Sequence, residues 1–195
     1  TQGFLKGGDS ASIPVLCVFD SEEVGSVSPQ GAGSSLLEDT LGRICDGLKL
    51  NRGRMLAQSF LVSADNAHAV HPNHPEYADP GNAPVMGGGL VIKYNANLSY
   101  CTDSVSAAVF RKICGRAGVK VQTYHNRADL PGGSTLGRIS LAHVSVPTVD
   151  IGLAQLAMHS CYETAAVSDA IDLENARAAY YGATLETTQT GFVIR

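Results

Sequence analysis

The hydrophobic residues of the chain gather in short runs that are separated by polar loops. Five runs have the length and the apolar content of strands that are buried inside a sheet. They cover residues 13–18, 59–63, 90–94, 119–124 and 147–152. Three other stretches, residues 36–48, 105–117 and 162–181, carry apolar side chains at helical spacing. This order predicts an α/β fold, namely a three-layer α/β/α sandwich with a mixed, mostly parallel sheet.

Polar residues next to the predicted helices mark their ends. Side chains that accept a hydrogen bond from the first turn are favoured at the start of a helix. The candidate caps, in chain order, are Ser34 or Ser35, then Asp103, then Asp169 and Asp172. The Pro- and Gly-rich residues 76–88 predict a loop, and a short helix is expected from Leu136.

An acidic turn follows the first predicted strand. Glu22 and Glu23 are adjacent there, and like charges so close raise each other's pKa unless a cation or proton intervenes. A bound metal resolves the conflict, because one carboxylate can bind the ion while the other takes a proton from water. The alternative is an acidic turn that is only solvated.

Other metal-binding residue types follow or end later strands. Asp65, Asp150 and His159 are placed in this way, and strand ends of an open α/β sheet are where ligands bind. Carboxylate and imidazole groups suit zinc. We therefore expect Glu23, Asp65, Asp150 and His159 to converge at one edge of the sheet, with Asp150 as a structural or supporting residue rather than a ligand.

Composition narrows the class of protein. With 195 residues, 44% of them hydrophobic, the chain is long enough for one domain with a large core. A net charge of −4 without a Lys/Arg cluster argues against nucleic acid and membranes as partners, and no apolar stretch is long enough to span a bilayer. The five cysteines form no CxxC pair, so we interpret them as reduced packing residues of a cytoplasmic protein.

Several motifs resemble those of the aspartyl aminopeptidase family. They occur in the family order at residues 19–26 (FDSEEVGS), 63–73 (SADNAHAVHPN), 93–97 (KYNAN), 132–137 (GGSTLG), 149–152 (VDIG) and 158–160 (MHS). The family consists of dinuclear-zinc exopeptidases that assemble into tetrahedral dodecamers. The resemblance therefore implies two zinc ions, with Mn or Co as possible substitutes, peptide substrates and a homo-oligomer.

The resemblance also implies roles for individual residues. Glu22 would be the general base, and Glu23, Asp65 and His159 would be zinc ligands. His68 and Lys93 would line the pocket for an acidic substrate side chain; the alternative for Lys93 is a solvated strand end. Gly133, Ser134 and Thr135, with the adjacent Gly132, offer backbone N–H groups and hydroxyls to a substrate, or they form a turn that only needs glycine.

The chain departs from the family at its amino end. The family also uses an upstream His and an Asp that bridges both zinc ions, with a dimerisation domain between them. Residues 1–12 offer only Asp9, in a different context. We therefore expect residues 1–195 to be the carboxy-terminal part of a catalytic domain, incomplete at its amino end. A separate amino-terminal fragment is a possible partner.

These observations predict a cytoplasmic metallo-aminopeptidase that removes amino-terminal Asp or Glu, with weak activity in this chain alone. Two alternatives stay open. One is a non-catalytic scaffold or assembly fragment that kept the fold. The other is a broad-specificity aminopeptidase or deacylase of the same fold.

Overall fold

The computed structural model describes all 195 residues and is built around a four-stranded sheet. Its strands, in spatial order, are β1 (Leu61–Ala64), β5 (Thr148–Gly152), β3 (Leu90–Tyr94) and β4 (Val121–His125). β1 runs parallel to β5, and β3 runs parallel to β4, but β3 and β5 are antiparallel. The predicted mixed, mostly parallel sheet is therefore confirmed.

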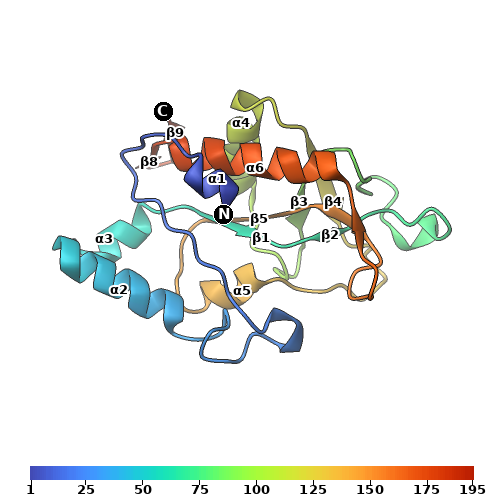
Figure 1. Cartoon of the computed structure of the whole chain (residues 1–195), viewed down its shortest axis with the longest axis horizontal. Helices are drawn as coiled ribbons and strands as arrows, with labels where there is room; N and C mark the ends of the chain where they lie inside the picture. Colours follow the sequence, from blue (N-terminus) through green and yellow to red (C-terminus); the bar gives the residue numbers. More distant parts are fainter.

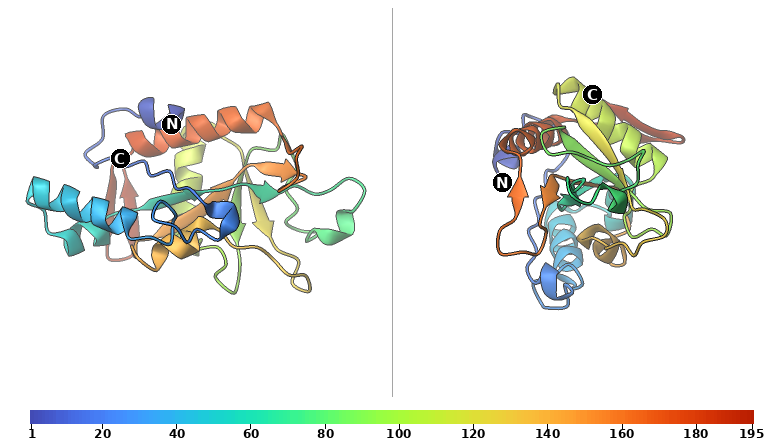
Figure 2. Two further views of the ribbon diagram at one scale, coloured as in Figure 1. Left: turned by 60° about the horizontal axis from the view of Figure 1, so that its bottom comes forward. Right: turned by 90° about the vertical axis from the view of Figure 1, so that its right-hand side faces the viewer.

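Helices cover both faces of this sheet (Figure 1, Figure 2). One layer holds α4 (Ser104–Arg116) and α6 (Val167–Gly182), and the other holds α5 (Leu136–Leu141) with α2 (Leu36–Leu48) beside it. The main core lies between the sheet and the α4–α6 layer, because alternate strand residues point to that face. Its buried members include Ile92, Phe110 and Ile151. The three-layer prediction is confirmed.

The predicted helix boundaries hold for α2 and α4. Asp103 accepts a hydrogen bond from the backbone N–H of Ser106 at 2.7 Å, and the Ser106 hydroxyl accepts one from the Asp103 N–H, which forms a capping box. At α2, the Ser34 hydroxyl accepts from the Leu36 N–H at 3.2 Å. The short helix at Leu136 and the loop over residues 76–88 are also present.

The prediction that Asp169 and Asp172 cap the last helix is wrong. Helix α6 begins at Val167 after Ala166, which makes no capping bond. Asp169 is instead fully buried and accepts hydrogen bonds from the backbone N–H groups of Gly87 at 2.8 Å and Gly89 at 3.1 Å. It ties the loop before β3 to the helix, a long-range role that local sequence spacing does not reveal.

The prediction of a buried strand over residues 13–18 is also wrong. This segment is extended, but it pairs with no strand, and most of its residues are exposed. It is tethered at the carbonyl of Val15, which accepts a hydrogen bond from the Tyr181 hydroxyl at 3.2 Å. A strand needs a neighbour for its backbone groups, and the outer edge of β1 lies across a groove from this segment.

That groove is large and mostly apolar. Its volume is about 890 Å³, and it lies between residues 11–19, the β1 strand, helix α2 and the end of α6. Val62 and Ala64 of β1 are among the lining residues. Because β1 pairs only with β5, its other edge opens into this groove.

Several short elements were not predicted, because two to six residues give no clear period. They are α1 (Gln2–Leu5), η1 (Glu22–Val24), α3 (Arg52–Ala57), β2 (Ala67–His68), η2 (Pro75–Tyr77), β6 (Ala154–Leu156), β7 (Thr164–Ala165), β8 (Leu185–Thr188) and β9 (Gly191–Ile194). Strands β2, β6 and β7 form a small sheet that continues from the ends of β1 and β5. The five cysteines are free; Cys45 and Cys114 are buried packing residues as predicted, but Cys161 is exposed, so the packing prediction is wrong for it. No helix has the length and apolar character that crossing a bilayer requires.

The buried anchor at Asp169 yields a stability prediction. Asp169→Ala removes two charge-assisted hydrogen bonds and leaves two N–H groups without a partner, so we expect a loss of about 2–4 kcal/mol in the free energy of unfolding. Urea unfolding at neutral pH measures this. Asp172→Ala, an acid on the same helix with no such bonds, should change stability by less than about 0.5 kcal/mol. Equal effects of the two substitutions would contradict the anchor role.

Candidate active site

The acidic turn is a short 3₁₀ helix held by its own backbone. Glu22 and Glu23 begin η1, with Ser21 before it at φ 62° and Gly25 after it at φ 97°. The Ser26 N–H donates to the Ser21 carbonyl at 2.7 Å, which closes the turn. Left-handed backbone at a non-glycine residue such as Ser21 is uncommon and is typical of functional turns. The turn presents both glutamates on the surface beside the sheet.

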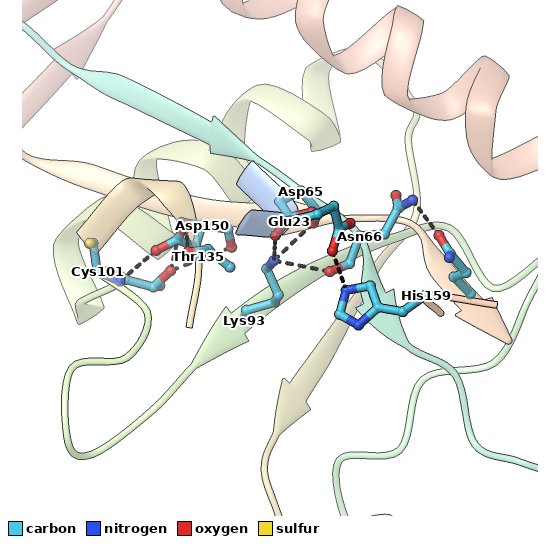
Figure 3. A network of polar contacts seen from close by, with 10 residues as sticks. Glu23, Asp65, Asn66, Lys93, Cys101, Thr135, Asp150 and His159 are labelled. Atoms are coloured by element: carbon cyan, nitrogen blue, oxygen red, sulfur yellow. Dashed lines mark hydrogen bonds and ion pairs between the residues drawn. The ribbon is translucent and has the colours of Figure 1, made fainter. Parts of the chain in front are cut away.

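His159 comes to the acidic turn from a distant part of the chain. It lies in the loop after β6, also with left-handed backbone, at φ 66°. Its Nε2 atom is 2.9 Å from Oε2 of Glu23, and both side chains are about two-thirds exposed (Figure 3). The predicted pairing of Glu23 and His159 at one place is therefore present in the structure.

Asp65 completes the group at the end of β1. It follows the last β1 residue, and its side chain is 34% exposed. Burial raises the pKa of Glu22 above its ordinary value, and the negative charges of Asp65 and Glu23 raise it further. His159 and Lys93 act in the opposite direction, more weakly. Glu22, Glu23, Asp65 and His159 thus form one electrostatically coupled cluster.

Lys93 lies beneath this cluster and is almost completely buried, with 1% of its surface exposed. Its Nζ atom donates to the backbone carbonyls of Asp65 at 2.8 Å and Asn66 at 3.2 Å, and it lies 3.9 Å from the Asp65 carboxylate (Figure 3). Burial lowers the pKa of Lys93, and Asp65 and Asp150 oppose that change. Its ammonium group faces backbone rather than an open pocket.

His68 lies at the surface on β2, on the same side as the cluster. Neighbouring atoms desolvate its ring and lower its pKa, and positive charge on His159 and Lys93 lowers it further, whereas Asp65 raises it. These couplings place His68 close to the acidic residues. Of the two predicted pocket cations, His68 is the accessible one.

Asp150 lies in the middle of β5 rather than at a strand end. It is fully buried, and its carboxylate accepts from the Thr135 hydroxyl at 2.8 Å and from the Cys101 N–H at 2.5 Å. This agrees with a structural role. Thr135 is buried, and its hydroxyl is already hydrogen-bonded to Asp150. Gly133 and Ser134 are exposed, and the space around Gly133 is open.

The donor groups of the cluster fit zinc in their chemistry. Carboxylate and imidazole are common zinc ligands, and two ligands of one tetrahedral zinc lie ~3.3 Å apart. The Glu23 and His159 atoms are 2.9 Å apart, which is a direct hydrogen-bond distance, so the two groups contact each other here and would need to separate slightly to share an ion. No three His, Cys, Asp or Glu side chains are arranged to hold one ion together. The candidate zinc ligands present are therefore one contacting pair, Glu23 and His159, with Asp65 near it.

Two supporting residues near Asp65 were not identified from the sequence. Asn66 hydrogen-bonds the buried Gln155 side chain, and Gly152 approaches the Asp65 backbone so closely that a methyl group there would collide with the Asp65 carbonyl oxygen. A glycine at the end of a buried strand is a signal of such close approach. Asn66 carried no comparable signal.

Comparison with known proteins identifies the family of the chain. A family model described as aminopeptidase I zinc metalloprotease (M18) matches residues 6–181, which is most of the chain. The chain belongs to the M18 family.

Curated relatives of this M18 chain are named aminopeptidases. It is 46% identical over 183 residues to a Mycobacterium tuberculosis protein named probable M18 family aminopeptidase 2, covering 91% of this chain and 42% of the relative. It is 45% identical over 165 residues to a Ricinus communis protein named probable aspartyl aminopeptidase, covering 83% and 33%. The M18 chain thus spans less than half the length of these relatives.

Solved structures show the same fold. A chain in the cryo-EM structure of the Ape4 and Nbr1 complex is 38% identical with a TM-score of 0.79, covering 84% of this chain and 32% of that one. The mApe1 dodecamer of Saccharomyces cerevisiae is 28% identical with a TM-score of 0.71, covering 83% and 36%. The predicted family and fold are confirmed.

The raised pKa of Glu22 yields a pH prediction for the metal-free chain. The folded state favours the protonated form, so the contribution of Glu22 to stability is present below its unfolded pKa of about 4.3 and is lost as pH rises through the higher folded value. Glu22→Gln should therefore be more stable than the parent at pH 7, with an advantage that disappears near pH 4. The advantage is small because the side chain is partly solvated.

Urea unfolding in a chelator between these pH values measures the effect. The exposed Asp9→Asn is the matched control and should show no such advantage. A Glu22→Gln advantage that stays constant with pH would contradict the assignment of the raised pKa to this carboxylate.

Proposed function

We propose that this M18 chain forms the metal-binding part of a zinc aminopeptidase that removes amino-terminal Asp or Glu from peptides. The observation that carries the proposal is the meeting of Glu22, Glu23, Asp65 and His159 from separate parts of the chain. The family and the names of the relatives support the reaction class, and one relative is named for aspartyl specificity.

The proposed mechanism assigns binding to three residues and proton transfer to one. Glu23 and His159 would hold one zinc ion, and Asp65 would hold the second, with Mn or Co as possible substitutes. Bound zinc supplies a lowered pKa for water and polarises the peptide carbonyl. Glu22 is the free carboxylate, and its raised pKa suits a group that accepts a proton from water and returns it to the leaving amine.

Selection of an acidic side chain is proposed to depend on a hydrogen-bond donor, the imidazole of His68, and on the buried positive charge of Lys93 beside the cluster. His68 is accessible and can donate a hydrogen bond to a carboxylate, which is a strong charge-assisted contact. Lys93 adds positive charge from its buried position without direct contact. Gly133 and Ser134 are exposed, so their backbone N–H groups can donate hydrogen bonds to the peptide. The Thr135 hydroxyl instead donates to the buried Asp150 carboxylate, which is a structural contact.

We further propose that residues 1–195 are the carboxy-terminal part of a longer catalytic domain and need additional ligands from a second polypeptide segment. Zinc usually has four ligands, so three protein ligands for two zinc ions leave coordination positions open and part of the positive charge without a counter-charge. The free edge of β1 and the apolar groove of about 890 Å³ beside it are places where such a segment could pack. A separate amino-terminal fragment that pairs with β1 would supply both needs.

The proposal also covers the oligomeric state and the cellular location of the complete enzyme. The dodecameric yeast neighbour supports a homo-oligomer for the complete enzyme. Five free thiols fit the reducing cytoplasm, where disulfides are rare.

The role of Glu22 is tested on the enzyme as purified from its source, with intact mass and zinc content measured on the same sample. We expect about two zinc ions per site, a co-purifying second segment, and cleavage of an aspartyl amide. Glu22→Gln should lose about 10²–10⁴-fold in kcat because the base is gone, while zinc is retained. Asp46→Asn, an exposed acid of helix α2 that does not line the groove, is the control. Full activity in Glu22→Gln would refute the assignment.

Specificity is tested with His68→Ala. Loss of the accessible imidazole should raise KM for the aspartyl amide by about tenfold, roughly one charge-assisted hydrogen bond, and should leave the leucyl amide unchanged. Equal rates on Asp, Leu and Ala amides in the parent would favour a broad-specificity aminopeptidase, and preference for an N-acyl amino acid would favour a deacylase. No hydrolysis of any substrate by the zinc-loaded protein would favour a scaffold.

A further inference from the structure

A buried acid on the central strand holds the loop that precedes helix α5. Asp150 is fully buried on β5, and its carboxylate accepts hydrogen bonds from the Thr135 hydroxyl at 2.8 Å and the Cys101 N–H at 2.5 Å (Figure 3). Burying a carboxylate is costly unless its oxygens are hydrogen-bonded. Thr135 is only 3% exposed, so water does not compete for its hydroxyl. The chain is therefore fixed to the sheet at Thr135.

Thr135 does not cap its own helix. It precedes the first residue of α5, a position where a threonine side chain usually accepts a hydrogen bond from a backbone N–H of the first turn. No such capping bond is present, and the hydroxyl donates to Asp150 instead. The threonine therefore joins the loop to β5 rather than stabilising the start of the helix.

The two residues before Thr135 expose backbone donors. Gly133 and Ser134 lie at the surface, and the space around Gly133 is open. Their N–H groups, the loop donors, do not donate to any carbonyl of the chain. Adjacent backbone N–H groups without an acceptor attract carbonyl or carboxylate oxygens. The loop donors are thus available to a bound molecule, and they directly precede a fixed point of the chain.

The fixed point lies beside the proposed active site. In Figure 3, Lys93 lies between the Asp150–Thr135 pair and Asp65. Burial lowers the pKa of Lys93, and the negative charges of Asp65 and Asp150 oppose that change, so the ammonium group is within electrostatic reach of both carboxylates. The anchor of the loop is therefore part of the surroundings of the site and not of a remote part of the core.

We propose that the Asp150–Thr135 pair positions the loop donors so that they bind the peptide backbone of the substrate. The inference rests on the proposed function and names the part of the substrate that this loop contacts. Thr135 touches no substrate atom and is a positioning residue. A loop without its anchor must be ordered when the peptide binds, and this ordering lowers affinity. The pair therefore contributes to substrate binding through the preorganised loop.

The first test measures the kinetics of Thr135→Val in the complete enzyme, because valine removes the hydroxyl and keeps the shape of the side chain. We expect KM to rise about five- to tenfold, the size of one hydrogen bond, with kcat changed by less than about twofold. The factor should be the same for tripeptides that begin with Asp, Leu or Ala, since their backbones are alike. The preference for an acidic residue should not change, because His68 and Lys93 are intact. Thr135→Ser keeps the hydroxyl and should restore the parent KM.

Thr102→Val is the matched control for general stability. The Thr102 hydroxyl is also buried and also bonds to Asp150, but it accepts from the backbone N–H at 2.8 Å and does not touch the loop. Both valine variants should lower the urea midpoint, and only Thr135→Val should raise KM. Equal changes of KM in the two variants would overturn the proposal. So would an unchanged KM in Thr135→Val, or a Thr135→Ser enzyme as impaired as Thr135→Val.

A second measurement on the 195-residue chain does not require activity. Nitrogen relaxation gives the order parameters of the loop donors, which are about 0.85 for rigid backbone and below about 0.6 for flexible backbone. We expect rigid values in the parent, Thr135→Ser and Thr102→Val, and flexible values in Thr135→Val. A flexible loop in the parent would overturn the proposal. The absence of any hydrolysis by the complete parent enzyme would reject the proposed function, whereas the relaxation data would still decide whether the Asp150–Thr135 pair holds the loop.

Discussion

The position of β5 in the centre of the sheet is the constraint on which the site depends. All five of its residues are buried, and it is paired on both edges, with β1 in parallel and β3 in antiparallel orientation. The parallel pairing brings Asp65 past the end of β5, where Gly152 leaves room for its backbone. The chain continues from β5 directly into β6, and His159 lies in the loop after β6. One buried strand thus sets the places of two of the proposed ligands.

The antiparallel pairing of β3 explains why the two predicted cations differ. Ile92 of β3 lies opposite Ile151 of β5, and the two strands run in opposite directions. The last residues of β3 therefore lie toward the start of β5, whereas Asp65 lies beside the end of β5. Lys93 therefore lies on the inner face next to Asp150 and reaches back to the Asp65 turn with its long side chain. His68 follows Asp65 directly on β2 and stays at the surface. The direction of the strand, rather than the residue type, therefore explains why Lys93 is buried and His68 is accessible.

Local signals were sufficient for much of this fold. The capping box at Asp103, the periodicity of α2 and α4, and the apolar runs of β3 and β5 involve neighbours in sequence, so they could be predicted. The motifs also identified the acidic turn, Asp65 and His159. The buried state of Lys93, the anchor at Asp169 and the unpaired state of residues 13–18 depend on contacts between residues far apart in the sequence. No periodicity or spacing within the chain encodes those facts.

The proposed general base, Glu22, and one proposed ligand, Glu23, lie on a part of the chain that forms no strand of the sheet. Residues 13–18 lead to Glu22 and Glu23 without pairing to any strand, although the turn itself is closed by the Ser26 to Ser21 bond. Its internal geometry is therefore fixed, and its placement depends on the packing of Cys17 and Phe19 against Leu37, Val144 and Val146 more than on the exposed contact between Glu23 and His159. Exposed ion pairs contribute little, about 0–1 kcal/mol. Under the proposed function, a polypeptide segment packed in the groove between residues 13–18 and β1 would contact both the segment that leads to the acidic turn and the strand that leads to Asp65.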